Sequence, residues 1–219
     1  MKSRALTLAA SAALFLSAMP ALAATVIFDD FTVNQKVVDE PTASAPNTST
    51  IAFGNGDRTL TVENTANNGD AEAATKFVIV GGALTFSNDQ GATGIGTLTY
   101  TGVGDIANGS DPFFFFDVAP DSFDAMAEFS ATATDSFGNS FVYEESLDGD
   151  FSPILYFSEF IGVDFNNLVT LSFSIESELT RVDGSLNSIS ISAIPLPAGG
   201  LLLIAGLGGL AALRRKKRA

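Results

Sequence analysis

Apolar and polar residues alternate along short stretches from residue 25 to residue 193, and Gly, Asn, Asp and Pro separate these stretches. A period of two is typical of β-strands with one buried face, and no part of this region repeats apolar residues at helical spacing for three turns. The expected strands cover residues 25–31, 50–53, 59–64, 76–80, 83–87, 96–100, 113–118, 125–135, 140–146, 154–158, 168–175 and 186–193. The pattern predicts an all-β fold, an antiparallel β-sandwich, because two packed sheets bury the apolar faces.

Turn chemistry predicts two of the strand pairings. Gly81-Gly82 lies between two apolar stretches and supplies the positive φ angles that a tight hairpin turn requires. The segment 135–139 returns the strand 125–135 into the strand 140–146. The segments 38–49 and 64–74 are polar and are expected to be exposed connections.

The run Phe113-Phe114-Phe115-Phe116 places phenylalanines on both faces of one strand. We expect this strand to be buried on both sides, as in the middle of a sandwich. The alternative is an exposed apolar patch that serves self-association.

The two ends of the β-region resemble those of bacterial jelly-roll modules, some of which bind carbohydrate. Asp29-Asp30-Phe31 follows the first apolar residues, and Leu186-Asn187-Ser188-Ile189-Ser190-Ile191 closes the region. The resemblance implies a jelly-roll-like sandwich with its terminal strands side by side. Asp29, Asp30 and Asn187 would then be candidate oxygen ligands of a structural calcium ion. The alternative is that these carboxylates are ordinary solvated residues at a strand end.

Residues 1–23 have the layout of a secretory signal peptide. Lys2 and Arg4 precede an apolar stretch, and Ala21 and Ala23 form a small-x-small cleavage site. The β-sandwich domain is therefore expected to cover residues 24–193 of an exported protein.

Charge is distributed unevenly along the chain. All 25 acidic residues lie between Asp29 and Asp183, but only four of the 11 basic residues (Lys36, Arg58, Lys76 and Arg181) share that span. The exported part is thus more acidic than the total charge of −14 indicates. Such an acidic domain repels nucleic acid, so we expect no nucleic-acid partner. The same acidity favours solubility.

The chain contains neither Cys nor His. This excludes disulfides, Cys or His nucleophilic chemistry, the Ser-His-Asp triad and the usual zinc sites. Carboxylates alone could act as catalytic acid and base, and their spacing singles out no pair, so we expect no enzyme and no cofactor beyond a structural calcium ion. The acidic segment Glu144-Glu145 to Asp148-Gly149-Asp150 lacks the full pattern of a calcium loop and is interpreted as a turn.

Carbohydrate binding is the alternative function. Sugar-binding surfaces use aromatic rings with a polar edge, and with no Trp in the chain the candidates are Tyr100, Tyr143 and Tyr156. A secreted glycoside hydrolase with paired carboxylates is a third possibility.

The C-terminal segment 194–219 has three parts. Ile194, Pro195, Leu196, Pro197 and Ala198 form a short motif, and residues 199–213 are rich in Gly, Ala and Leu. The final part, 214–219, contains the basic cluster Arg214, Arg215, Lys216, Lys217 and Arg218. The predicted transmembrane helix covers residues 199–213, which is short for a bilayer, and counting from Ile194 gives 20 residues, enough to span it. The basic cluster acts as a stop-transfer signal that stays cytoplasmic.

This tail resembles the VPLPA-CTERM sorting signal, a variant of the PEP-CTERM signals on exported proteins of Gram-negative bacteria. It departs from the motif by Ile194 in place of Val. The resemblance implies an exosortase partner, an inner-membrane intermediate held by the C-terminal transmembrane helix, and removal of the tail near the motif. It also implies delivery to the cell surface or extracellular matrix, where such proteins are associated with extracellular polysaccharide and biofilm. The expected function is therefore that of a non-enzymatic structural protein of the surface or matrix.

Overall fold

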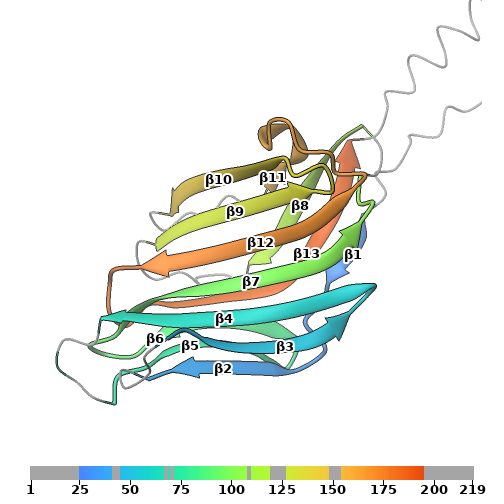
Figure 1. The fold of residues 1–219 in the computed structure, drawn as a ribbon. Helices are drawn as coiled ribbons and strands as arrows, with labels where there is room; N and C mark the ends of the chain where they lie inside the picture. Colours follow the sequence, from blue (N-terminus) through green and yellow to red (C-terminus); the bar gives the residue numbers. More distant parts are fainter. Residues whose placement is uncertain are drawn as a thin grey trace, which may run out of the picture. The chain divides into compact units, whose positions relative to one another are not determined.

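Two antiparallel sheets form the fold in the computed structural model, which describes residues 25–40, 45–66, 69, 72–107, 110–118, 127–147 and 154–194. The seven-stranded sheet has the order β11 (Ile154–Tyr156), β8 (Ser110–Val118), β13 (Asp183–Ile194), β6 (Ala83–Asn88), β5 (Thr75–Val80) and β2 (Gln35–Asp39), with β1 (Val26–Asp29) paired to β13. The six-stranded sheet has the order β10 (Ser140–Leu147), β9 (Ala127–Asp135), β12 (Leu168–Ser177), β7 (Thr93–Gly104), β4 (Gly56–Ala66) and β3 (Asn47–Phe53). Figure 1 shows the six-stranded sheet in front of the other.

The predicted β-sandwich is confirmed, and the period of two explains its core. In β9, Ala127, Phe129, Ala131 and Ala133 are buried, whereas the residues between them are more exposed. Phenylalanine supplies much of the core volume, as the rings of Phe114, Phe116, Phe129 and Phe173 contact one another between the sheets. Apolar burial of this kind is the main term that stabilises the fold. Regular helix within the described residues is limited to one 3₁₀ turn, Phe157–Glu159.

Both predicted hairpins are present. Gly81 and Gly82 have φ angles of 63° and 83°, and Val80 lies opposite Ala83 across the turn. Strands β9 and β10 pair from Thr134–Ser140 to Ala127–Leu147. The terminal strands also lie side by side, with Val26 opposite Ile191.

Strand β2 is absent from the sequence prediction, which placed residues 38–49 in an exposed loop. Its inward residues are Gln35, Val37 and Asp39, so two of three buried positions are polar and hide the alternation. Both polar side chains have partners: Gln35 Nε2 donates to Ser49 O (2.6 Å), and Asp39 Oδ2 accepts from Asn64 N (2.7 Å). The same loop prediction missed the start of β3 at Asn47.

The expectation that the phenylalanine run is buried on both faces is wrong for one face. Phe114 and Phe116 point into the core and are 0% and 2% exposed, whereas Phe113 is half-buried and Phe115 is 38% exposed. One face of β8 packs against the other sheet, and among the described residues no further sheet covers its opposite face.

Candidate functional site

Asp29, a predicted calcium ligand, lies buried at the end of β1 and binds other protein groups. Its Oδ1 and Oδ2 accept from Nη1 of Arg58 at 2.9 and 2.8 Å. Oδ2 also accepts from the hydroxyl of Tyr100 (2.6 Å), and Oδ1 from the backbone N–H of Phe31 (2.9 Å). The carboxylate is therefore fully used as an acceptor within the protein.

Arg58, on β4 of the opposite sheet, is 1% exposed and holds the N-terminal segment between the sheets. Its Nε donates to Gln35 Oε1 (3.1 Å) and its Nη2 to Val33 O (2.6 Å). The guanidinium also lies 6.0 Å from the ring centroid of Phe31 and 5.8 Å from that of Phe53. A buried charge is tolerated when it is paired and hydrogen-bonded in this way.

Tyr100 completes this cluster from β7. Burial raises the pKa of its hydroxyl well above the usual value, and the negative charge of Asp29 raises it further. The group is thus a neutral donor to the carboxylate at any physiological pH, which is a structural role.

The other two predicted calcium ligands lie apart from this cluster. Asp30 is exposed, and its Oδ1 accepts from the side chain and backbone of Thr32, which lower the pKa of Asp30. Asn187 is exposed at an irregularity of β13. Its neighbours Leu186 and Ser188 lie opposite Val118 and Asp117, and Asn187 falls between these two pairs. Within the residues that the structure describes, no three Asp, Glu, His or Cys side chains are grouped as metal ligands. Calcium binding stays a prediction.

The three tyrosines occupy different environments. Tyr100 is in the core, and Tyr143 on β10 is half-buried, with its hydroxyl donating to Glu145 Oε2 (3.1 Å). Burial and this contact raise the pKa of Tyr143 to about 12. Tyr156 lies on the outer side of β11, where its ring centroid is 5.5 Å from that of Phe113.

Tyr156 belongs to a surface that we call the aromatic face. It comprises Phe113 and Phe115 of β8 and Ile154 and Tyr156 of β11, and the neighbouring Ser190 and Ser192 of β13 are buried (6% and 7% exposed). In the register of the seven-stranded sheet, Phe113 lies between Tyr156 and Ser192, and Phe115 lies between Ile154 and Ser190. The Oγ of Ser192 also contacts Thr25 Oγ at 2.7 Å, which borders the face on the β1 side.

The aromatic face offers two kinds of contact on one sheet surface. Phe113 and Tyr156 form a tilted ring pair with an interplanar angle of 57°. The flat faces of such rings suit the apolar side of a sugar ring, and the Tyr156 hydroxyl is a hydrogen-bonding group beside them. Tyr156 could be named from the sequence but its partners could not, because β8, β11 and β13 are brought together only by the sheet.

The outer side of the six-stranded sheet is different and carries hydroxyl groups. One row runs across the strands through Thr50, Thr59, Thr99, Ser172 and Thr132, each opposite the next. Their side chains bond across the strands, with Oγ–Oγ distances of 2.9 Å for Thr50–Thr59 and 3.0 Å for Thr99–Ser172. Threonine suits exposed strand positions, so this hydroxyl face has a sufficient structural explanation.

A groove of about 240 Å³ lies at one end of the hydroxyl face. We call it the acidic groove, and its outward-pointing side chains are Ile95, Glu128, Ser130, Glu144, Ser146, Ser174 and Glu176. Glu128 lies directly opposite Glu176 in the register of β9 and β12. Sequence analysis missed this groove. The sequence shows only one glutamate at an outward position in each of β9, β10 and β12, namely Glu128, Glu144 and Glu176.

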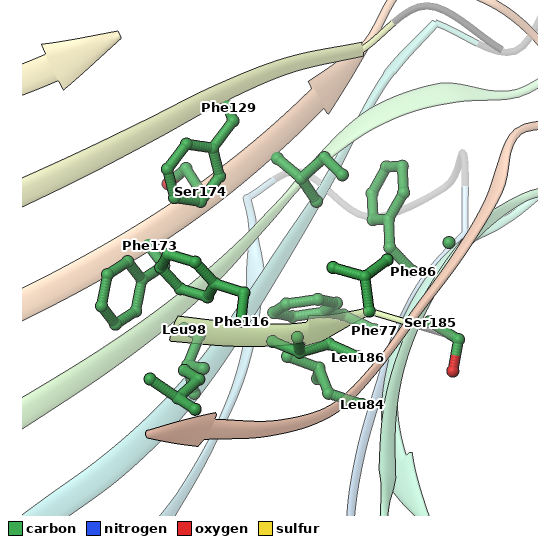
Figure 2. A pocket seen from close by; sticks show the side chains of 14 residues that line it. Phe77, Leu84, Phe86, Leu98, Phe116, Phe129, Phe173, Ser174, Ser185 and Leu186 are labelled. Carbon is green, nitrogen blue, oxygen red and sulfur yellow. The ribbon is translucent and has the colours of Figure 1, made fainter. Parts of the chain in front are cut away.

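A second hollow is lined mainly by apolar side chains of the two sheets (Figure 2). Phe77, Phe86, Phe116 and Phe173 contribute rings to its lining, and Leu98 closes another side. Its volume is about 60 Å³. We interpret it as a packing void between the two sheets.

The predicted sorting and processing residues fall almost entirely outside the described part. Only Ile194 is described, as the last residue of β13 opposite Ser110. The signal-peptide site at Ala21 and Ala23, the residues Pro195–Ala198 and the basic cluster lie outside the described residues, as do Asp148–Asp150. Among the residues that are described, no helix has the length and apolarity needed to cross a membrane.

Comparison with known proteins gives distant structural neighbours. No family model and no curated protein matches the chain. Among solved structures, the family 11 carbohydrate-binding module of a Clostridium thermocellum cellulase has 13% identity and a TM-score of 0.40, covering 79% of this chain and 95% of that one. A carbohydrate-binding module solved with β-1,4-galactotriose, TmCBM61, has 14% identity and a TM-score of 0.39, covering 74% of this chain and 89% of that one.

A further neighbour, the structure of PfGH50B, has 13% identity and a TM-score of 0.40. The match covers 62% of this chain but only 23% of PfGH50B. These are proteins to which the chain is similar in its sandwich architecture, and such TM-scores assign neither a family nor a ligand to it.

Proposed function

We propose that this protein is an exported, non-enzymatic polysaccharide-binding protein of the cell surface or extracellular matrix. The observation that carries the proposal is the aromatic face, where the ring centroids of the half-buried Phe113 and Tyr156 lie 5.5 Å apart and Phe115 is 38% exposed. Partly exposed rings beside the Tyr156 hydroxyl suit a pyranose, which has one apolar side and a polar rim.

The route to this location is proposed from the two chain ends. The signal peptide directs export, and the C-terminal segment holds the protein in the inner membrane until an exosortase recognises Ile194–Ala198 and removes the tail. The acidic body supports a free, hydrated domain, because its negative charge disfavours adsorption to anionic surfaces.

Binding is tested by affinity electrophoresis of the purified protein through gels that contain soluble polysaccharides. Tyr156→Ala and Phe113→Ala should each weaken binding about tenfold, equivalent to about 1.4 kcal/mol for loss of a stacked ring. The matched control is Tyr143→Ala, which removes a half-buried tyrosine from the other sheet. Unaltered binding in both aromatic-face variants, or no binding to any polysaccharide by the parent protein, would overturn the proposal.

A glycoside hydrolase is the second candidate, favoured by the opposition of Glu128 and Glu176 in the acidic groove. Paired carboxylates on either side of a glycosidic bond are what such catalysis requires. Release of reducing ends from polysaccharide that Glu176→Gln abolishes would establish this activity. Release that persists in Glu176→Gln and Glu128→Gln would assign it to a contaminant.

Processing is tested by the intact mass of the protein from its native host. A mature chain that begins after Ala23 and lacks the residues beyond the motif would support sorting by cleavage. A chain that still ends at Ala219 would show a permanent anchor instead.

A further inference from the structure

Two loops at one end of the sandwich expose large apolar side chains to solvent. Phe137, in the turn between β9 and β10, is 74% exposed, and Ile161, just after the 3₁₀ turn, is 75% exposed. These are the highest values among the large hydrophobic residues of the described chain. A glycine follows each of them, and Gly138 and Gly162 have φ angles of 86° and 85°. Both apolar side chains therefore stand at tight turns.

The two loops are braced against each other. Ser136 N donates to Asn167 O (2.8 Å), and Asp164 N donates to Asp135 Oδ2 (3.1 Å). Asp135 Oδ1 also accepts from the backbone N–H of Phe137 (2.9 Å). These bonds hold the loops that carry Phe137 and Ile161 as one unit, which we call the loop tips.

The loop tips lie at the end of the sandwich where β13 finishes. Leu168 pairs with both Asp135 and Gly104, so the loops border the last residue of β7. The short connection from Gly104 leads to Ser110, which pairs with Ile194. Figure 1 shows the end of β13 and the turn after β9 toward the same side of the sandwich.

The sequence beyond Ile194 limits how far this end can be from a membrane. Four residues separate Ile194 from Gly199, where the apolar segment 199–213 begins. The five extended residue steps from Ile194 to Gly199 span at most about 18 Å. If the tail is inserted as proposed above, the end of the sandwich with the loop tips is tethered close to the bilayer, where even weak apolar contacts are favoured by a high effective concentration.

We propose that the loop tips rest on the membrane while the tail is inserted, with Phe137 and Ile161 in the boundary between headgroups and acyl chains. The partner is a zwitterionic lipid surface, because the nearby carboxylates of Asp135, Glu159 and Asp164 would be repelled by anionic lipids. Exposed aromatic and aliphatic side chains are those that this boundary accepts. The inference goes beyond polysaccharide binding and depends only on tail insertion.

The test uses the absence of Trp from the chain, which makes any introduced Trp the only one. Phe137→Trp and Ile161→Trp are made in the full chain and reconstituted in zwitterionic vesicles that contain brominated lipids. The matched control is Leu179→Trp, an exposed apolar site (46%) in the connection after β12, at the opposite end of that strand.

Brominated lipids should quench both loop-tip variants at least about threefold more strongly than the control, because the tips enter the acyl boundary. Equal quenching at all three positions, or none at the loop tips, would overturn the proposal. Protection of the loop-tip Trp from an aqueous quencher without quenching by lipid would also overturn it, since this would indicate a second protein copy. If the full chain stays in the soluble fraction and does not bind the vesicles through its tail, the tail insertion on which the inference depends is refuted.

Discussion

Two ion pairs of this protein have the same chemistry and opposite environments. Arg58 and Asp29 are 1% and 2% exposed at the side chain, whereas Lys76 and Asp89 are 39% and 35% exposed. The buried pair is surrounded by Tyr100, Gln35 and backbone groups, and it joins the first strand to the opposite sheet. The exposed pair joins Lys76 of β5 to Asp89, the residue that follows the neighbouring strand β6. Burial, more than the presence of opposite charges, decides how much each pair contributes.

Removal of one partner of the buried pair should give the largest effect. Asp29→Ala leaves Arg58 charged inside the protein, and the expected loss is about 3–5 kcal/mol of the free energy of unfolding. The measurement is urea unfolding followed by far-UV circular dichroism. Asp30→Ala is the matched control, because Asp30 is exposed and bonds only within its own turn. Similar losses in the two variants would show that burial does not distinguish them.

Tyr100→Phe should give the next largest effect. It removes one donor to Asp29 Oδ2 without creating a large cavity, and loss of a hydrogen bond to a buried charge costs about 1.5–3 kcal/mol. Tyr143→Phe removes the analogous hydroxyl from a half-buried site and serves as its control. The prediction fails if both variants unfold at the same urea concentration.

Lys76→Ala tests the exposed pair and should cost no more than about 1 kcal/mol, because solvent weakens the attraction and two long side chains lose freedom. The difference between parent and variant should shrink further in 1 M salt, where charges are screened over about 3 Å. A loss as large as that of Asp29→Ala would contradict the comparison.

The smallest effect is the pH dependence of the exposed pair. The hydrogen bond from Lys76 lowers the pKa of Asp89, so the folded state favours the ionised carboxylate more than the unfolded chain does. The resulting stability is present above the ordinary aspartate pKa of about 3.9 and is lost as the pH falls below it. Melting temperatures of the parent and Lys76→Ala should therefore converge at low pH. A gap that persists there would show that packing of the Lys76 stem matters more than its charge.

The strand pattern and the turns could be predicted from the sequence because they depend on neighbours along the chain. Gly81-Gly82 determines its own hairpin, and β9 shows its buried face by alternation alone. The cluster at Arg58 could not be predicted, because Asp29, Gln35 and Tyr100 approach it from three other strands or loops. Gln35 also hid β2, because it places a polar residue at an inward position of that strand. The interpretation of Asp29 as a calcium ligand came from the resemblance of the chain ends to jelly-roll modules, since its partners could not be seen in the sequence.

The candidate sites divide in the same way. Tyr156 could be named as a sugar-stacking residue from its type, but its pairing with Phe113 depends on the position of β11 at the edge of the seven-stranded sheet. The aromatic face was not predicted, because both faces of the strand Phe113–Phe116 were expected to be buried. The sequence does not show that one face of β8 is left uncovered by another sheet. The acidic groove brings together carboxylates of three strands, and no spacing along the chain reveals it.

The adjacency of Thr25 and Ser192 gives the domain a property that concerns its connectivity. The two ends of the β-sandwich are close enough for a short glycine linker to join residue 194 to residue 25 without disturbing β1 or β13. New ends could then be opened between Gly81 and Gly82, where added Cβ atoms would meet nothing within 4 Å. A circular permutant of this kind would carry the same sandwich with its ends moved away from the loop tips.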